Sequence, residues 1–97
     1  MPSWLVRVEG DTVNLVTMKR SKSGGGYILR LAECAGTHAG AKVTWRSGLP
    51  VQRAFLCTSK EQKLSELAVS NGSISLTLSA HAVETVLLEL TAGSGRN

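Results

Sequence analysis

The stretch VNLVTMKRSKSGGGYILRLAE, residues 13–33, decides the fold of this chain. On both sides of a glycine run, side chains alternate with a period of two, which is the pattern of a strand with two distinct faces. The glycine-rich connection between the two runs predicts a β-hairpin. In the second arm, we expect one face to carry Tyr27, Leu29 and Leu31 and the other Ile28, Arg30 and Ala32. In the first arm, we expect Val13, Leu15 and Thr17 on one face and Asn14, Val16 and Met18 on the other.

The same alternation covers most of the remaining chain. Upstream, Trp4, Val6 and Val8 share one face of an expected strand. Downstream, we expect strands over residues 42–46, 51–58, 73–79 and 83–90, with a tight turn at Asn71-Gly72. The polar segment 59–67, rich in lysine and glutamate, is expected to form a loop. The side chains that we expect in the core are Leu29, Leu31, Ile74, Leu76 and Val86.

These elements place the chain in the all-β class, as a small antiparallel β-sandwich of seven or eight strands. The turn signals are closely spaced, and no long helical pattern interrupts them. A chain of 97 residues has room for one hydrophobic core. We therefore expect a single domain over residues 1–92 and a flexible C-terminal tail over residues 93–97.

The inventory of reactive side chains is small. The chain holds one aspartate, Asp11, six glutamates and two histidines, His38 and His81. We expect no catalytic, cofactor-binding or metal-binding residue among them, because most metal and acid–base sites need a larger set of matched groups. Glu33 and Glu84 fall on expected strands, where Arg30 or a lysine can neutralise them. We therefore favour a structural charge for both residues over a glycosidase pair of catalytic carboxylates.

The cysteines and the N-terminal residues are the features of the sequence that indicate the cellular compartment. Cys34 and Cys57 are not in a CxxC motif, and two cysteines do not supply the four ligands of a zinc site. We expect them as small apolar side chains in a reduced protein, with a single cross-strand disulfide as the alternative. No signal-peptide pattern and no apolar run of membrane-spanning length is present. The sequence favours a cytoplasmic protein with no membrane partner.

The net charge of +4 is concentrated near the hairpin, at Lys19, Arg20, Lys22 and Arg30. A nucleic-acid surface normally places aromatic side chains among its basic residues, and here only Tyr27 is close. A solvated hairpin end is therefore favoured, and no nucleic-acid partner is expected.

Three aromatic residues, Trp4, Trp45 and Tyr27, are the candidates for contact with a carbohydrate or with a partner surface. Two tryptophans could form a stacking platform for sugars, whereas a domain with few aromatics tends to bury its largest side chains. An exposed Trp4 or Trp45 would support carbohydrate binding, and burial of both would remove that interpretation.

Four segments, taken in order, resemble a known family. They are residues 14–20 (NLVTMKR), 27–33 (YILRLAE) followed by Gly36, 49–54 (LPVQRA) and 83–88 (VETVLL). With Arg30, Glu33, Gly36 and Thr85 in step, this ordered set resembles the C-terminal β-sandwich domain of the family 38 glycoside hydrolases, the α-mannosidases. The resemblance covers roughly residues 3–90.

The resemblance implies a β module that packs against a catalytic domain and helps to shape it. Family 38 enzymes are retaining α-mannosidases that use an Asp nucleophile and a zinc held by His and Asp side chains, all within a large N-terminal domain. The resemblance therefore implies an accessory, non-catalytic domain, with zinc only in a parent catalytic domain. The expected partner is such a catalytic domain, in cis or in trans, and similarity of a domain does not by itself confer the activity.

Two alternatives stay open at this point. One is a stand-alone carbohydrate-binding module. The other is a small interaction protein that forms a homodimer through the surface that the catalytic domain would cover. Sheet edges with few charges could also pair in such a dimer, and residues 83–90 and 73–79 are the candidates.

Overall fold

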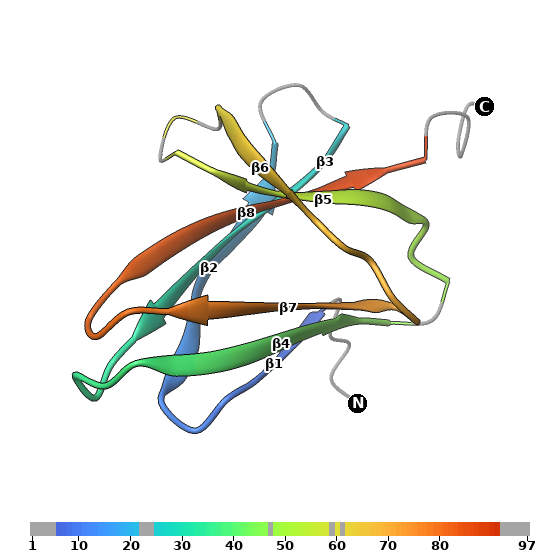
Figure 1. The fold of residues 1–97 in the computed structure, drawn as a ribbon. Coiled ribbons are helices and arrows are strands. Elements are labelled where there is room, and N and C mark those ends of the chain that lie inside the picture. Colours follow the sequence, from blue (N-terminus) through green and yellow to red (C-terminus); the bar gives the residue numbers. More distant parts are fainter. Residues whose placement is uncertain (1–5, 22–24, 47, 59, 61, 92–97) are drawn as a thin grey trace.

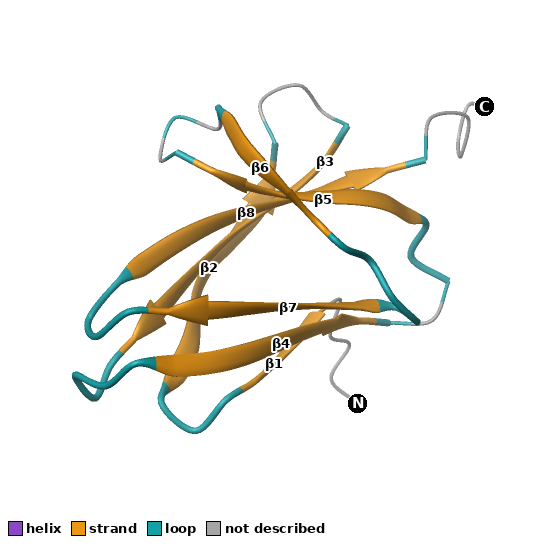
Figure 2. Ribbon diagram, in the orientation of Figure 1, coloured by secondary structure: helices purple, strands orange, loops and turns teal. Residues whose placement is uncertain are grey.

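The computed structural model describes residues 6–21, 25–46, 48–58, 60 and 62–91, and these residues form eight β-strands and no helix (Figures 1 and 2). The strands are β1 (Val6–Glu9), β2 (Val13–Arg20), β3 (Gly26–Glu33), β4 (Ala39–Trp45), β5 (Val51–Cys57), β6 (Lys63–Leu67), β7 (Ser73–Leu78) and β8 (Val83–Leu90). The expected tail over residues 93–97 lies outside the described residues.

The strands form two antiparallel sheets that lie as two layers (Figure 1). The three-stranded sheet has the order β1-β4-β7, and the five-stranded sheet has the order β2-β3-β8-β5-β6. The all-β sandwich is thus confirmed. The hairpin of β2 and β3 is confirmed as well, and β8 has the bounds that the sequence predicts.

The core lies between the two sheets. Leu29, Leu31 and Val86 come from the five-stranded sheet, and Ile74 and Leu76 come from the three-stranded sheet. All five side chains are buried, as the alternation predicts. The turn at Asn71-Gly72 is confirmed by positive φ angles of 51° and 79°, which a tight hairpin turn requires at both central positions.

The face assignment of β2 is wrong beyond Leu15. The register with β3 shifts between Leu15 and Thr17, so that Val16 is an extra residue in a β-bulge. Val16 is 59% exposed, and Met18 lies opposite Leu29 and packs on the core. A single inserted residue therefore moves Thr17 and Met18 to the faces opposite to those expected.

Segment 59–67 also differs from the expectation, because its second half is a strand. β6 pairs with β5 at the end of the five-stranded sheet. Only one neighbouring strand is available there and most of the side chains of β6 are exposed, so a polar sequence suffices. β4 begins at Ala39, earlier than expected, and β8 lies at the centre of its sheet instead of at an edge.

The five-stranded sheet carries a second apolar cluster on its outer face. Ile28, Phe55, Cys57 and Leu87 form it, and each is at most 9% exposed. The Nζ of Lys63 lies 4.4 Å from the centroid of the Phe55 ring and 3.0 Å from a carboxylate oxygen of Glu89. A long side chain that keeps its charge in solvent thus covers an apolar ring on the outside of the sheet.

Candidate functional site: the loops tied by Glu33

The last residue of β3, Glu33, carries a buried carboxylate that accepts hydrogen bonds from two separate loops. Its carboxylate accepts hydrogen bonds from the backbone N–H groups of Ala35, Gly36 and Thr37 at 3.1, 2.7 and 3.1 Å. It also accepts one from the backbone N–H of His81 at 3.0 Å. Glu33 is only 2% exposed. One carboxylate therefore ties the β3–β4 loop to the β7–β8 turn.

The local sequence makes this convergence of N–H groups possible. Gly36 has a φ of +84°, a left-handed conformation that L side chains rarely adopt. A Cβ at this position would lie 2.8 Å from Nε2 of His81, so the imidazole packs directly on the glycine backbone. His81 itself has a φ of 57°, which turns its N–H toward Glu33. We refer to Glu33 and its four N–H donors as the Glu33 tie.

The Glu33 tie lowers the pKa of Glu33 from 4.5 to about 2. The hydrogen bond from the His81 backbone contributes most, followed by the Thr12 hydroxyl and by the backbone of Ala35 and Gly36, while burial acts in the opposite direction. Glu33 is therefore an anion at neutral pH and holds no proton to donate to a substrate.

The structure separates the aromatic candidates. Trp45 is 7% exposed and belongs to the core of the sandwich, so its ring offers no open face for stacking on a sugar. Tyr27 is half-buried on β3, and the guanidinium carbon of Arg20 lies 5.7 Å from its ring centroid. Trp4 lies outside the described residues. Tyr27 and Trp45 sit in different sheets, so they do not form a shared platform.

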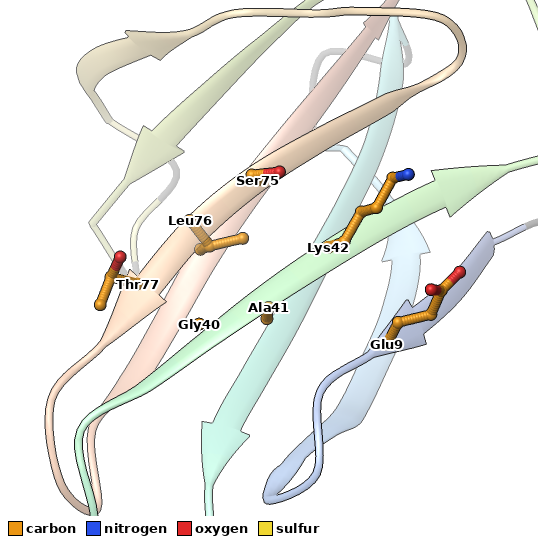
Figure 3. Close-up of a pocket in the computed structure, with 7 residues that line it drawn as sticks. All are labelled: Glu9, Gly40, Ala41, Lys42, Ser75, Leu76 and Thr77. Atoms are coloured by element: carbon orange, nitrogen blue, oxygen red, sulfur yellow. The ribbon is translucent and has the colours of Figure 1, made fainter.

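A shallow depression lies on the outer surface of the three-stranded sheet (Figure 3). It has a volume of about 510 Å³, and its lining consists of Glu9, Gly40, Ala41, Lys42, Ser75, Leu76 and Thr77. Gly40 leaves open space where a side chain would stand. The carboxylate, ammonium and hydroxyl groups could hydrogen-bond a polar molecule, but no aromatic ring lines the depression.

Metal ligands are not gathered in the described part of the chain. No group of three His, Cys, Asp or Glu side chains is close enough there to hold an ion. The oxygens of Glu33 are already occupied by N–H donors. The described residues therefore do not fit the zinc that family 38 enzymes use. Cys34 is exposed and Cys57 is buried, and neither of these described cysteines forms a disulfide.

The sequence pattern singled out Glu33 and Gly36 without indicating what they do. The expectation was a strand glutamate neutralised by Arg30 or by a lysine, and the structure instead supplies four backbone N–H groups. A glutamate at the end of a strand, followed three residues later by a glycine, is the available signal. The fourth donor, His81, is far away in the sequence, so only the fold reveals it.

The fold and the tie define a small antiparallel β-sandwich in which a buried carboxylate fixes the loops at one end. The model of the family described as "Glycosyl hydrolases family 38 C-terminal beta sandwich domain" matches residues 12–86. The match covers well over half of the chain, and the chain belongs to this family. Among curated proteins, none matches.

Within the described part of the chain, no helix is long and apolar enough to cross a membrane.

Proposed function

We propose that this chain is an accessory, non-catalytic domain that packs against an α-mannosidase-like catalytic domain, in cis or in trans. The observation that carries the proposal is the Glu33 tie. In this family 38 β-sandwich, the buried Glu33 carboxylate holds two loops together and has no free position for catalysis. A carboxylate held as an anion by four backbone donors suits the fixing of loop shape, whereas a glycosidase acid needs a raised pKa.

The loops that Glu33 ties together are suited to contact with a second domain. Ala35 and Thr37 are exposed on one loop, and Ala80 and His81 are exposed on the other. Small side chains let another surface approach the backbone closely, and loops that are already fixed lose little conformational entropy when a partner binds. We therefore place the contact with the catalytic domain at this end of the sandwich.

Carbohydrate binding receives less support. Trp45 is buried, and the depression in Figure 3 has no aromatic lining. Stacking on an aromatic face is what the expected sugar platform required, so the accessory function is the better conclusion from these residues.

The test is a reconstitution in trans. A family 38 α-mannosidase shortened by its last β-sandwich is mixed with this chain, and the unfolding midpoint and turnover of the shortened enzyme are measured. We expect the midpoint to rise with the wild-type chain and to rise less with Glu33→Gln, while Lys60→Ala, an exposed change away from the tied loops, behaves as wild type. The absence of any shift or complex with the wild-type chain would overturn the proposal.

The isolated chain provides a second, independent measurement. We expect no hydrolysis of an aryl α-mannoside, with or without added zinc. Hydrolysis that a chelator abolishes and that a mock preparation lacks would contradict the non-catalytic assignment.

A further inference from the structure

Four strands lie at sheet edges, and three of them carry features that discourage pairing with another chain. β1 is four residues long and contains Arg7 and Glu9. β2 contains the bulge at Val16 and ends in Lys19-Arg20, and β6 contains Lys63 and Glu66 beside an irregular register. Charges, bulges and short length are the usual protection of an edge. β7, with the sequence SISLTL, has no charge, no proline and no register shift against β4.

The hydrogen bonds around β7 fix which of its backbone groups face outward. The N–H of Trp45 donates to the carbonyl of Gly72, so Gly72 points toward β4. Ser73 points the other way, because it exchanges hydrogen bonds with Ser70 at 2.9 and 3.1 Å. In an antiparallel ladder this direction alternates from residue to residue. Ser75 and Thr77 therefore direct their backbone N–H and C=O groups away from β4, toward the open edge.

The side chains of β7 define what a new neighbour must look like. Ile74, Leu76 and Leu78 are buried toward the five-stranded sheet, and Ser75 and Thr77 are exposed on the outer surface. Residues that lie opposite each other in an antiparallel pair point to the same face. A partner strand must therefore alternate apolar and hydroxyl side chains in the same way, which a second β7 does.

We propose that two copies of this chain pair antiparallel through β7, about a two-fold axis at Leu76, so that their three-stranded sheets become one six-stranded sheet. Ser75 of each copy then lies opposite Thr77 of the other, and these residues exchange four N–H···O=C bonds. A two-fold axis at Ser75 gives only two such bonds, because Ser73 is already bonded to Ser70. A two-fold axis at Thr77 would set Ser75 opposite Ser79, which lies beyond the end of β7 and whose C=O already accepts the N–H of Ala82. The contact uses backbone groups and leaves the Glu33 tie untouched, so it is independent of the proposed accessory function.

The contact area is small, and the net charge of +4 on each copy opposes association. We therefore expect a concentration-dependent dimer, strengthened by salt that screens the charge repulsion. Sedimentation equilibrium of the wild-type chain at ~100 µM, a concentration suited to a weak interface, should give a mass approaching twice 10.3 kDa. Dilution should return it to the monomer mass.

Charge substitutions at the two edge residues test the register. In the double variant Ser75→Lys with Thr77→Lys, like charges lie directly opposite each other twice, and we expect a monomer. In Ser75→Lys with Thr77→Glu, each lysine faces a glutamate of the other copy, and we expect the dimer to return. Both positions are exposed on the outer surface, and circular dichroism checks that each variant folds.

Amide hydrogen exchange of the wild-type chain gives a readout that needs no variant. The amides of Ser75 and Thr77 should be protected at the high concentration and exchange faster after dilution, while the amide of Trp45, bonded within the chain, stays protected at both. A wild-type chain that stays at 10.3 kDa overturns the proposal. So does a dimer that the double-lysine variant leaves intact, or one whose Ser75 and Thr77 amides stay unprotected.

Discussion

Two charged side chains of the five-stranded sheet, Glu33 on β3 and Lys63 on β6, each bind a neighbouring segment, and they differ in burial and in the number of hydrogen bonds they make. Glu33 is buried and accepts four backbone hydrogen bonds, which join two loops. Lys63 makes one ion pair with Glu89 at 3.0 Å, and the two side chains are 49% and 32% exposed. Hydrogen bonds to a charge are strong where solvent is excluded and weak where water competes. The same kind of interaction is therefore structural in one place and marginal in the other.

The largest effect that we expect on β3 comes from its apolar face and sets the scale for this comparison. Leu29 is fully buried between the sheets. Leu29→Ala should lower the free energy of unfolding by about 2–5 kcal/mol, because it removes buried methyl groups and leaves a cavity. Urea denaturation measures this change, and Ser75→Ala, on an exposed position of β7, is the control and should change little. Equal losses from the two variants would show that the face assignment is wrong.

The loss from Glu33→Gln should be smaller than that from Leu29→Ala but clear, and it should depend on pH. The pKa of Glu33 is lowered in the folded state from 4.5 to about 2, so the unfolded chain binds more protons between these values and stability rises with pH there. The contribution of the charged carboxylate is fully present above about pH 4.5 and is lost as the pH falls toward 2. Urea midpoints of both proteins measured from pH 2 to pH 7 should therefore converge at the acid end.

A constant difference between the urea midpoints of the wild type and Glu33→Gln from pH 2 to pH 7 would contradict this prediction. It would mean that the substitution acts through the shape of the side chain and not through its charge. Glu84→Gln is the matched control, since Glu84 lies on β8 of the same sheet and takes no part in the tie. Its curve should follow the wild type where Glu33→Gln departs from it.

The sequence predicted the sheets better than it predicted their irregularities. Period-two alternation was sufficient to place the core side chains of β7, which buries one face at regular intervals, and those of β3 and β8, although these two strands also bury Ile28 and Leu87 on the outer face. It failed at Val16, since a bulge changes the face without changing the composition. It also failed at β6, whose strand conformation comes from pairing with β5 and not from its own polar residues.

The candidate site was predicted less well, for a related reason. Glu33 and Gly36 are close in sequence, so a local pattern contains them. The backbone N–H of His81 reaches Glu33 because His81 has a positive φ angle and lies in the turn that connects β7 and β8, which belong to different sheets. Local alternation carries no information about such a contact. The burial of Trp45 likewise follows from its inward position on β4, which the sequence left undecided.

The smallest effect should come from the exposed side of the comparison. Lys63→Ala removes the ion pair with Glu89 and the ammonium above Phe55, and exposed pairs and cation–π contacts are each worth up to about 1 kcal/mol. The side chain also has an aliphatic stem beside the Phe55 ring, so charge and cover must be separated. Lys63→Met keeps an apolar side chain of similar length and removes the charge.

If the aliphatic stem on the Phe55 ring matters more than the charge, Lys63→Met should match the wild type in urea denaturation, while Lys63→Ala should lose a fraction of a kcal/mol. Lys60→Ala, a change at another exposed lysine, is the control and should lose nothing. A loss from Lys63→Met that disappears in high salt would instead assign the effect to charge, because salt screens exposed pairs and leaves apolar cover intact. A loss as large as that of Leu29→Ala would break the comparison altogether, since it would make an exposed lysine equal to a core side chain.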